Sequence, residues 1–192
     1  MNAPDRIKTT KCKQCRSPFI KFRMEQKTCL NPECLVKQGR IEAAKREAKE
    51  SRAHRAEINA KRESLKSRRQ WINEAQHACN AWIRERDRGL PCISCGRHHQ
   101  GQNHAGHYLS TGARPGLRFD PRNIWLQCAP CNTHLSGNLI NYRIGLIARI
   151  GLEAVEVLEG DHTTRKWSID ELRDIRDTYR ADLKRLKAAN ND

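Results

Sequence analysis

No run of about 18 apolar residues, the length that spans a membrane as a helix, occurs anywhere in this sequence. Aromatic residues are also scarce, at 5% of the 192 residues, and hydrophobic residues of all kinds make up only 37%. A single large core is therefore not expected. Two small cores stapled by metal ions fit this composition better, because small domains often depend on a metal for stability.

Acidic residues are outnumbered, since 22 Asp and Glu residues face 37 Lys and Arg residues, and the formal net charge is +15. A charge of this size predicts an anionic partner, of which nucleic acid is the commonest. The alternative is a basic surface that water and counter-ions alone solvate.

The first ten residues, MNAPDRIKTT, lack the apolar segment of a secretory signal peptide. We therefore expect a cytoplasmic protein with reduced cysteines and no membrane partner. Eight of the nine cysteines fall into close pairs, which in this compartment favours metal sites over disulfides. The ninth, Cys79, lies in a helical pattern and is predicted to be a small, buried hydrophobic residue.

The stretch from Pro91 to Asn138 organises the rest of the chain. It contains two Cys-x-x-Cys pairs, which together present four thiolates to one tetrahedral zinc ion. These predicted zinc ligands are Cys92, Cys95, Cys128 and Cys131. Between and after the pairs lie more histidines and asparagines than a structural zinc site needs, namely His98, His99, His104, His107, Asn123, Asn132 and His134. This surplus points to a function beyond folding.

A second cluster of four cysteines predicts a small zinc knuckle near the N-terminus. Its ligands would be Cys12, Cys15, Cys29 and Cys34. Basic residues on this knuckle, Lys13 and Arg16 among them, are candidates to contact DNA phosphates. A folding staple with a basic rim is the alternative, and the two interpretations are compatible.

Between residues 36 and 69 the chain is rich in strong helix formers and carries twelve Lys or Arg residues against five Glu residues. We expect a long basic helix here. Weakly heptad-spaced apolar residues from Ile41 to Ile72 suggest a docking face or a loose homodimer. A solvated linker and an arm that follows DNA are the alternatives.

The predicted fold class is α+β and mainly helical. Trp71 and Trp82 anchor a helix over residues 70–88, and Ser168 with Glu171 forms a capping box that opens the last helix. Four segments are expected, namely a zinc knuckle at residues 1–36, a basic helical linker at 37–69, a zinc-bound domain at 70–160 and a C-terminal helix at 161–192.

A β-hairpin followed by a helix is predicted in the central stretch. The first strand begins at His104, the Gly- and Pro-rich residues 110–121 form the loop, and residues 122–127 form the return strand. The helix starts at Cys128. A metal-assisted phosphodiesterase needs a hard cation and a general base with a pKa near neutrality, a task that suits histidine. A hairpin followed by a helix can present both the cation ligands and the general base.

The order GH…RNIWLQCxxCN, with Cys-x-x-Cys pairs on both sides, resembles the HNH (ββα-metal) nucleases, including phage junction resolvases of the endonuclease VII type. The whole chain resembles the lambdoid phage NinG (Rap) recombination nucleases, and the similarity covers nearly all 192 residues. It includes the N-terminal cysteines, the basic helix and the segments LEAVEVLEG and SIDELRDI. The resemblance implies an endonuclease that cleaves branched DNA, such as Holliday junctions and D-loops, in the cytoplasm of a bacterial host.

The resemblance implies a role for each motif position. His107 would be the general base, against the alternative of a buried structural histidine. Asn123 would orient the hairpin or hold the imidazole, against the alternative of a plain strand amide. Asn132 would bind the catalytic cation, with helix capping as the rival role, and His134 is an alternative for that ligand position.

One position departs from the common HNH pattern. Gly106 stands where many members carry an acidic ligand directly before the base. His104 is the nearest substitute, but strand alternation puts it on the face opposite His107. Both histidines can serve only if a bulge at Gly106 breaks the alternation.

Two kinds of ion are expected. Zn²⁺ at the two four-cysteine sites would be structural, because no coordination position stays open. Mg²⁺ or Mn²⁺ would be the catalytic cation. Arg114, Arg118 and Arg122 are candidates to clamp the DNA backbone through their guanidinium groups.

Two other functions compete with a junction nuclease. One is a non-catalytic zinc protein that binds DNA, and the other is an HNH nuclease that cuts ordinary duplex DNA. Net charge does not separate the three, because phosphate contacts carry no shape or sequence preference. Recombination proteins are further candidate partners by the same resemblance.

Overall fold

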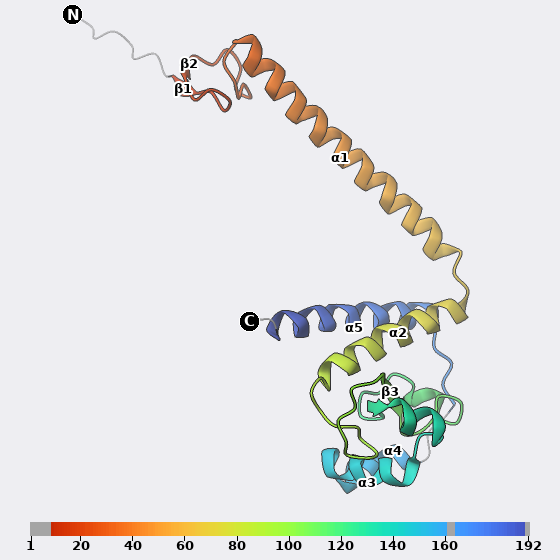
Figure 1. The fold of residues 1–192 in the computed structure, drawn as a ribbon. Coiled ribbons are helices and arrows are strands. Elements are labelled where there is room, and N and C mark those ends of the chain that lie inside the picture. The colour runs from red at the N-terminus through yellow and green to blue at the C-terminus, as the bar shows by residue number, and fades with distance from the viewer. Residues whose placement is uncertain (1–8, 161–163, 191–192) are drawn as a thin grey trace, which may run out of the picture. The chain divides into compact units, whose positions relative to one another are not determined.

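The computed structural model describes residues 9–160 and 164–190. The chain divides into two units, Met1–Leu65 and Lys66–Asp192, each of which is described by itself (Figure 1). The boundary after Leu65 falls inside the segment 37–69 that the sequence suggests as one linker. The predicted segments 1–36 and 161–192 both begin with residues outside the described part of the chain.

The N-terminal unit contains one small sheet and one long helix. Strands β1 (Thr10–Lys11) and β2 (Pro18–Phe19) pair antiparallel, and helix α1 (Pro32–Ser64) follows. Asn31 caps α1, because its side chain accepts a hydrogen bond from the Glu33 N–H at 2.9 Å. Among the described residues of α1, only Cys34 is buried, as expected for a helix with so few apolar residues.

Two helices form one layer of the C-terminal unit. Helix α2 (Arg68–Arg86) begins with a capping box formed by Ser67 and Gln70. Helix α5 (Ile169–Ala189) lies beside it, and the predicted capping box of Ser168 and Glu171 is confirmed (Figure 1). The predicted burial of Cys79 is also confirmed, at 0% exposure.

A two-stranded antiparallel hairpin lies between two hydrophobic cores. Strand β3 (Asn103–His107) pairs with β4 (Ile124–Cys128), and short helices η1 (Pro115–Leu117) and η2 (Pro130–His134) occur in the hairpin loop and after β4. The first core joins α2 and α5 to the hairpin and contains Trp71, Ala75, Cys79, Ile83, Ala105, Phe119, Ile124 and Leu172. The second core is built with α3 (Leu139–Ile150) and α4 (Leu152–Glu159) and contains Ile93, Tyr108, Leu117, Tyr142, Leu146, Val155 and Leu158.

The end of α2 is clamped to strand β4. Asp87 is 1% exposed, and its carboxylate accepts a hydrogen bond from the Leu126 N–H at 2.8 Å. Arg86 pairs with that carboxylate at 2.6 Å and donates to the Ile124 carbonyl at 3.0 Å. These contacts hold the polar face of α2 against the hairpin, where the candidate site lies.

Three expectations about element boundaries are wrong. The seam from Ile41 to Ile72 is not continuous, because α1 ends at Ser64 and Ser67 caps a separate helix. The helix expected at Cys128 begins only at Pro130, since β4 continues through Cys128 and proline favours a first helical turn. The first strand of the predicted hairpin extends past His107 toward the loop at residue 110, whereas β3 ends at His107.

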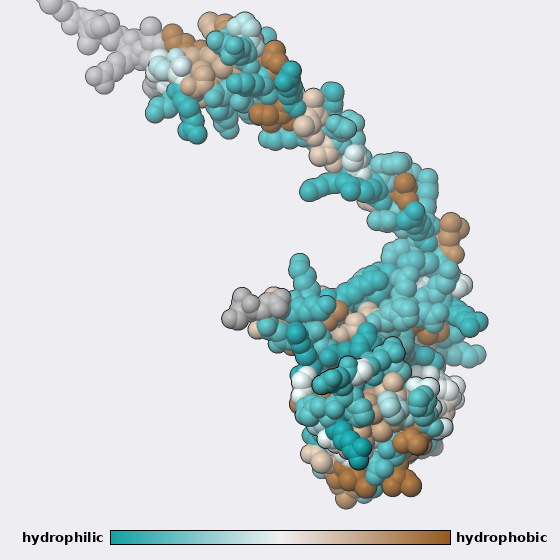
Figure 2. All heavy atoms as spheres, viewed as in Figure 1, coloured by the Kyte–Doolittle hydropathy of each residue, from teal (hydrophilic) through white to brown (hydrophobic). Residues whose placement is uncertain are grey.

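The surface is largely hydrophilic, with apolar side chains gathered over α3 and α4 (Figure 2). Ile140 and Ile144 are 81% and 63% exposed there. Within the described residues, no helix combines the length and the apolar character needed to cross a membrane.

Candidate active site and zinc centres

The central cysteine cluster is assembled as the spacing predicts. The sulfurs of Cys92, Cys95, Cys128 and Cys131 all lie within 4.8 Å of one another. Burial opposes ionisation of Cys92, but N–H groups of Cys128, Cys95 and Ser94 bond to its sulfur, and the net effect lowers its pKa to about 7. Four sulfurs gathered this closely, with Cys92 the most readily ionised of those whose pKa is shifted, fit structural zinc.

The N-terminal cluster has the same composition. The sulfurs of Cys12, Cys15, Cys29 and Cys34 also lie within 4.8 Å of one another. Cys34 belongs to the first turn of α1, so an ion here would join the knuckle to the helix. Lys13 and Arg16, the predicted phosphate contacts, are exposed on this knuckle. All nine cysteines of the described chain are free of disulfides.

Two predicted cation ligands meet at a cavity. His104 on β3 and Asn132 on η2 are both half-buried, and Asn132 Nδ2 donates to His104 Nδ1 at 2.8 Å. They line a cavity of about 490 Å³ together with Asn80 and Arg84 of α2 and the neighbouring Asn103. An imidazole nitrogen and an amide oxygen are both suitable ligands for Mn²⁺, and the amide oxygen also suits Mg²⁺.

His107 lies on the other face of β3. The pairing from Asn103 with Cys128 to His107 with Ile124 is unbroken, so no bulge rotates His107 toward His104. His107 Nε2 lies 3.0 Å from the Arg118 carbonyl oxygen, which can only accept. Nε2 therefore carries the proton and Nδ1 keeps its lone pair.

Burial sets the charge of His107. Loss of solvation is the largest influence and lowers its pKa below the ordinary value of 6.5, although the hydrogen bond to the Arg118 carbonyl raises it in part. The imidazole is therefore neutral at pH 7. A neutral imidazole with a defined tautomer can accept a proton at Nδ1.

Asn123 fastens the hairpin loop. It is fully buried, its Oδ1 accepts the Leu109 N–H at 2.9 Å, and its Nδ2 donates to the carbonyls of Leu109 and Leu117. These bonds tie the chain that leaves β3 to η1. None of its described hydrogen bonds reaches the imidazole of His107.

The remaining predicted residues lie outside this cavity. His134 is exposed on η2. Arg122 is paired with Asp120 at 2.7 Å, and Arg118 donates to Gln76 at 3.4 Å. Arg114 is half-buried at the start of η1. The three arginines therefore surround the hairpin loop instead of the His104–Asn132 pair.

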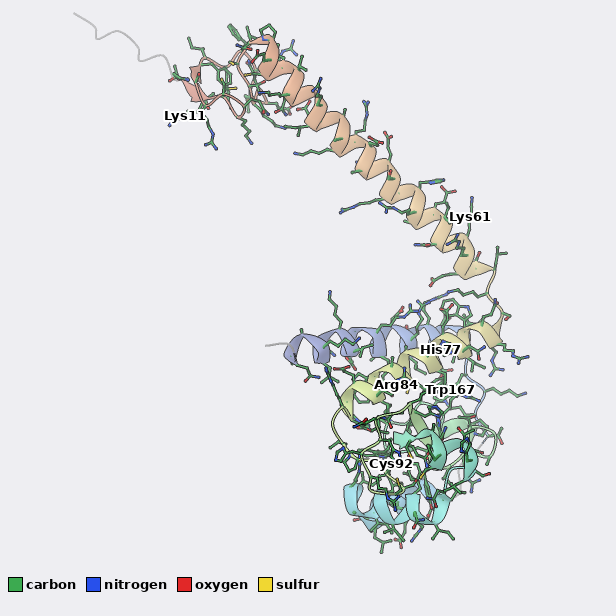
Figure 3. The ribbon with its side chains drawn as sticks, in the orientation of Figure 1. Lys11, Lys61, His77, Arg84, Cys92 and Trp167 are labelled. Atoms are coloured by element: carbon green, nitrogen blue, oxygen red, sulfur yellow. The ribbon has the colours of Figure 1, made fainter. Side chains whose placement is uncertain are left out.

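Sequence reasoning missed three arginines beside the cavity. A second cavity of about 260 Å³ shares Arg84 and Asn103 with the first and is lined also by Arg88 and Arg97 (Figure 3 labels Arg84 on α2). Arg84 and Arg97 have no ion pair within the described residues. No sequence signal distinguished them from other surface arginines, because α2 meets β3 only in the folded chain.

Gln127 on β4 was missed as well. It is fully buried, and its Nε2 donates to Ser94 Oγ at 2.7 Å and to the Gly137 carbonyl at 2.6 Å. A Cβ atom placed on Gly106 would lie 2.2 Å from Gln127 Oε1. The space that a side chain before His107 would need is thus filled by the Gln127 amide.

Comparison with known proteins places the chain in a family. The family model described as "Bacteriophage Lambda NinG protein" matches residues 4–189. The chain is 42% identical to Protein ninG of Escherichia phage lambda over 193 residues, covering 92% of this chain and 93% of that protein. Protein ninG of Salmonella phage P22 gives the same identity and coverage.

A third relative matches a shorter stretch. Protein ninG of Escherichia phage 933W is 54% identical over 124 residues, which span 65% of this chain and 62% of that relative's length. No solved structure matches the chain. The long matches to the family and to the phage lambda and P22 proteins are decisive, and the chain belongs to the NinG family of lambdoid phages.

Proposed function

We propose that this protein is a metal-dependent DNA endonuclease of the HNH (ββα-metal) type, acting on branched recombination intermediates such as Holliday junctions. The observation that carries the proposal is the meeting of His104 and Asn132 at a cavity beside an arginine of α2. This pair is presented by a hairpin and a short helix that four cysteines hold together. Preference for branched DNA rests on the family resemblance.

The position of β3 at an edge of its sheet suggests how His107 would take part. Within the described residues β3 pairs with β4 alone, so its other edge carries no strand. A phosphate along this edge would be reachable by His104 and Asn132 from one face and by His107 from the other. Nδ1 of His107 would accept the proton of the attacking water, and Arg84 would neutralise phosphate charge.

The ions have separate tasks. His104 and Asn132 would hold Mg²⁺ or Mn²⁺, whose charge beside the phosphate stabilises the developing negative charge. The four central cysteines would hold zinc with no open position, so that ion keeps β4, η2 and the knuckle in register. The cysteines of the N-terminal unit would hold the second zinc.

Cleavage of a labelled four-way junction and a matched linear duplex tests the function. With Mg²⁺ or Mn²⁺ we expect the junction to be cut at least about tenfold faster than the duplex. Equal cutting of both would keep an HNH nuclease and remove the junction preference. Binding without cutting in either cation would leave a zinc-stapled DNA-binding protein.

The arginine-lined cavity predicts a phosphate contact next to the cutting site. Arg88 and Arg97 are both exposed. Arg97 has no ion pair within the described residues and is available to an approaching strand, whereas Arg88 pairs with Glu85 at 3.4 Å. For Arg97→Ala we expect the slope of log affinity against log salt to fall by about one, because one phosphate contact is lost. A smaller fall is expected for Arg88→Ala, because Arg88 must leave Glu85 to contact a phosphate.

Fluorescence anisotropy with a labelled junction at several salt concentrations measures this slope without cleavage. Arg180→Ala is the matched control, because Arg180 is an exposed arginine of α5 that lines neither cavity. An unchanged slope in Arg97→Ala, or an equal fall in the control, would contradict the contact.

A further inference from the structure

The buried amide of Gln127 has one end satisfied and one end free. Its Nε2 donates two hydrogen bonds, and the Gly137 carbonyl fixes which end is the nitrogen, because a carbonyl can only accept. Among the described residues, Gln127 Oε1 is the only buried side-chain oxygen without a hydrogen-bond partner. A buried acceptor left without a donor costs roughly 1–3 kcal/mol, so this atom calls for an explanation.

Asn132 presents an oxygen to the same space. A Cβ atom placed on Gly106 would lie 2.2 Å from Gln127 Oε1 and 3.1 Å from Asn132 Oδ1. Two acceptors therefore face one small volume that only a glycine leaves open. On its other side, Asn132 Nδ2 donates to His104 Nδ1 and occupies the lone pair that a cation would need.

A half-turn of the Asn132 amide separates the two facing oxygens of Asn132 and Gln127 and also frees the lone pair of His104 Nδ1. The torsion that exchanges Oδ1 and Nδ2 is soft, and the two ends have nearly the same shape. After the turn, Nδ2 faces the unsatisfied Oε1 of Gln127, and Oδ1 stands beside Nδ1 of His104. The amide and imidazole atoms that face each other are now 2.8 Å apart. Neighbouring ligands of Mg²⁺ in an octahedral shell are about 3 Å apart.

We propose that Gln127 is a positioning residue, whose buried oxygen turns the Asn132 amide so that Asn132 Oδ1 and His104 Nδ1 together bind a hard divalent cation. The inference rests on the proposed function for the identity of the ion. Ser94, which holds Gln127 Nε2, lies between Cys92 and Cys95. The zinc knuckle thereby sets the orientation of a cation ligand on η2.

This arrangement also accounts for the glycine before His107. An acidic side chain at position 106 would collide with Gln127 Oε1. The chain therefore supplies its ligands from His104 and Asn132 and uses the space at Gly106 for the amide that orients Asn132.

Mn²⁺ binding to the zinc-loaded full chain, without DNA, tests the inference. Electron paramagnetic resonance of free Mn²⁺ gives the dissociation constant, and loss of binding in His104→Ala assigns the site. We expect Gln127→Met, which keeps volume but removes the acceptor, to weaken Mn²⁺ binding 10- to 100-fold. Gln38→Met, the same change at a half-buried residue of the N-terminal unit, should stay within about threefold of wild type.

Asn132→Asp separates orientation from folding. A carboxylate presents oxygen on both sides and needs no orienting partner, so Gln127→Met should cost no Mn²⁺ affinity in that background. The inference would be overturned if Gln127→Met lost as much Mn²⁺ affinity with Asp at position 132 as with Asn there. It would also be overturned if the Mn²⁺ affinity of Gln127→Met stayed within threefold of wild type. A wild-type chain that binds no Mn²⁺ at millimolar concentration would overturn it as well.

Two further outcomes keep the inference separate from the function. If Gln127→Met does not fold, Gln127→Glu is the substitute, because it retains an acceptor and, when protonated, a donor to the Gly137 carbonyl. An Mn²⁺ affinity of Gln127→Glu within about threefold of wild type supports the inference. A tenfold loss of Mn²⁺ affinity overturns it. Mn²⁺ binding that depends on His104 and Gln127, without cleavage of any DNA, would refute the nuclease and leave the positioning role intact.

Discussion

His107→Ala is expected to lower junction cleavage by about 10²- to 10⁴-fold while junction binding is retained. The structure provides the reason, because the bond to the Arg118 carbonyl keeps the proton on Nε2 and leaves Nδ1 free to accept another. The alanine substitution removes the proton acceptor Nδ1 but leaves every arginine and cysteine in place, so binding should be retained. Single-turnover cleavage and anisotropy binding on the same junction measure the two effects.

Two comparison variants sharpen this result. His77→Ala changes an exposed histidine of α2 and should cut at the wild-type rate (Figure 3). His104→Ala should regain part of its activity at higher Mn²⁺, because it loses affinity for the cation, whereas His107→Ala should not. Wild-type cutting by His107→Ala would place the base elsewhere.

The pH dependence of the same rate provides a second readout of His107. A base must be deprotonated to act, and burial lowers the pKa of His107 below 6.5. The rate should therefore rise with pH, reach half its plateau below pH 6.5, and be flat between pH 7 and 8. A midpoint at or above pH 6.5 would contradict a buried neutral base.

Loss of the central zinc is expected to unfold the C-terminal unit. Cys92→Ser removes one of four ligands that join the knuckle, β4 and η2. Structural zinc contributes roughly 10–16 kcal/mol of apparent binding free energy in small zinc domains, and whole domains are stable by only about 5–15 kcal/mol. The hairpin and the proposed cation ligands His104 and Asn132 should therefore lose their arrangement together.

Zinc content by mass spectrometry and thermal unfolding by circular dichroism measure this effect. Cys12→Ser should also lose one zinc per chain but leave the main transition of residues 66–192 in place, since Cys12 belongs to the other unit. Cys79→Ser is the matched control, because Cys79 is buried but belongs to neither cluster and should keep both zinc ions. A folded, zinc-free Cys92→Ser variant would show that the metal is dispensable.

Features that depend on short spacing were predictable from residues alone. Cys-x-x-Cys pairs bring sulfurs together within one turn, and both clusters are assembled in the structure. Ser168 and Glu171 are three residues apart and cap their helix as expected. The resemblance to the NinG family, carried by motifs along most of the chain, is confirmed by the family match.

The length of the helices was less predictable. The sequence predicts a basic helix up to about residue 69 and a separate helix over 70–88, yet α1 ends at Ser64 and a capping box of Ser67 and Gln70 opens α2 at Arg68. Helix propensity is similar on both sides of this point. The capping box and the burial of Trp71 against α5 decide where α2 begins, and the second of these is a contact between residues about a hundred positions apart.

By itself, the sequence determined the family, the two cysteine clusters and the pool of histidines and asparagines from which a site can be drawn. Only the tertiary structure decided which of these meet. Unbroken strand pairing puts His104 beside Asn132 and turns His107 to the other face. Arg84 reaches the cavity because Asp87 and Arg86 clamp α2 to β4. Ser94 and Gly137 hold the Gln127 amide, and its oxygen lies beside Gly106, as does Asn132 Oδ1. Such contacts depend on packing between distant segments, which local periodicity does not encode.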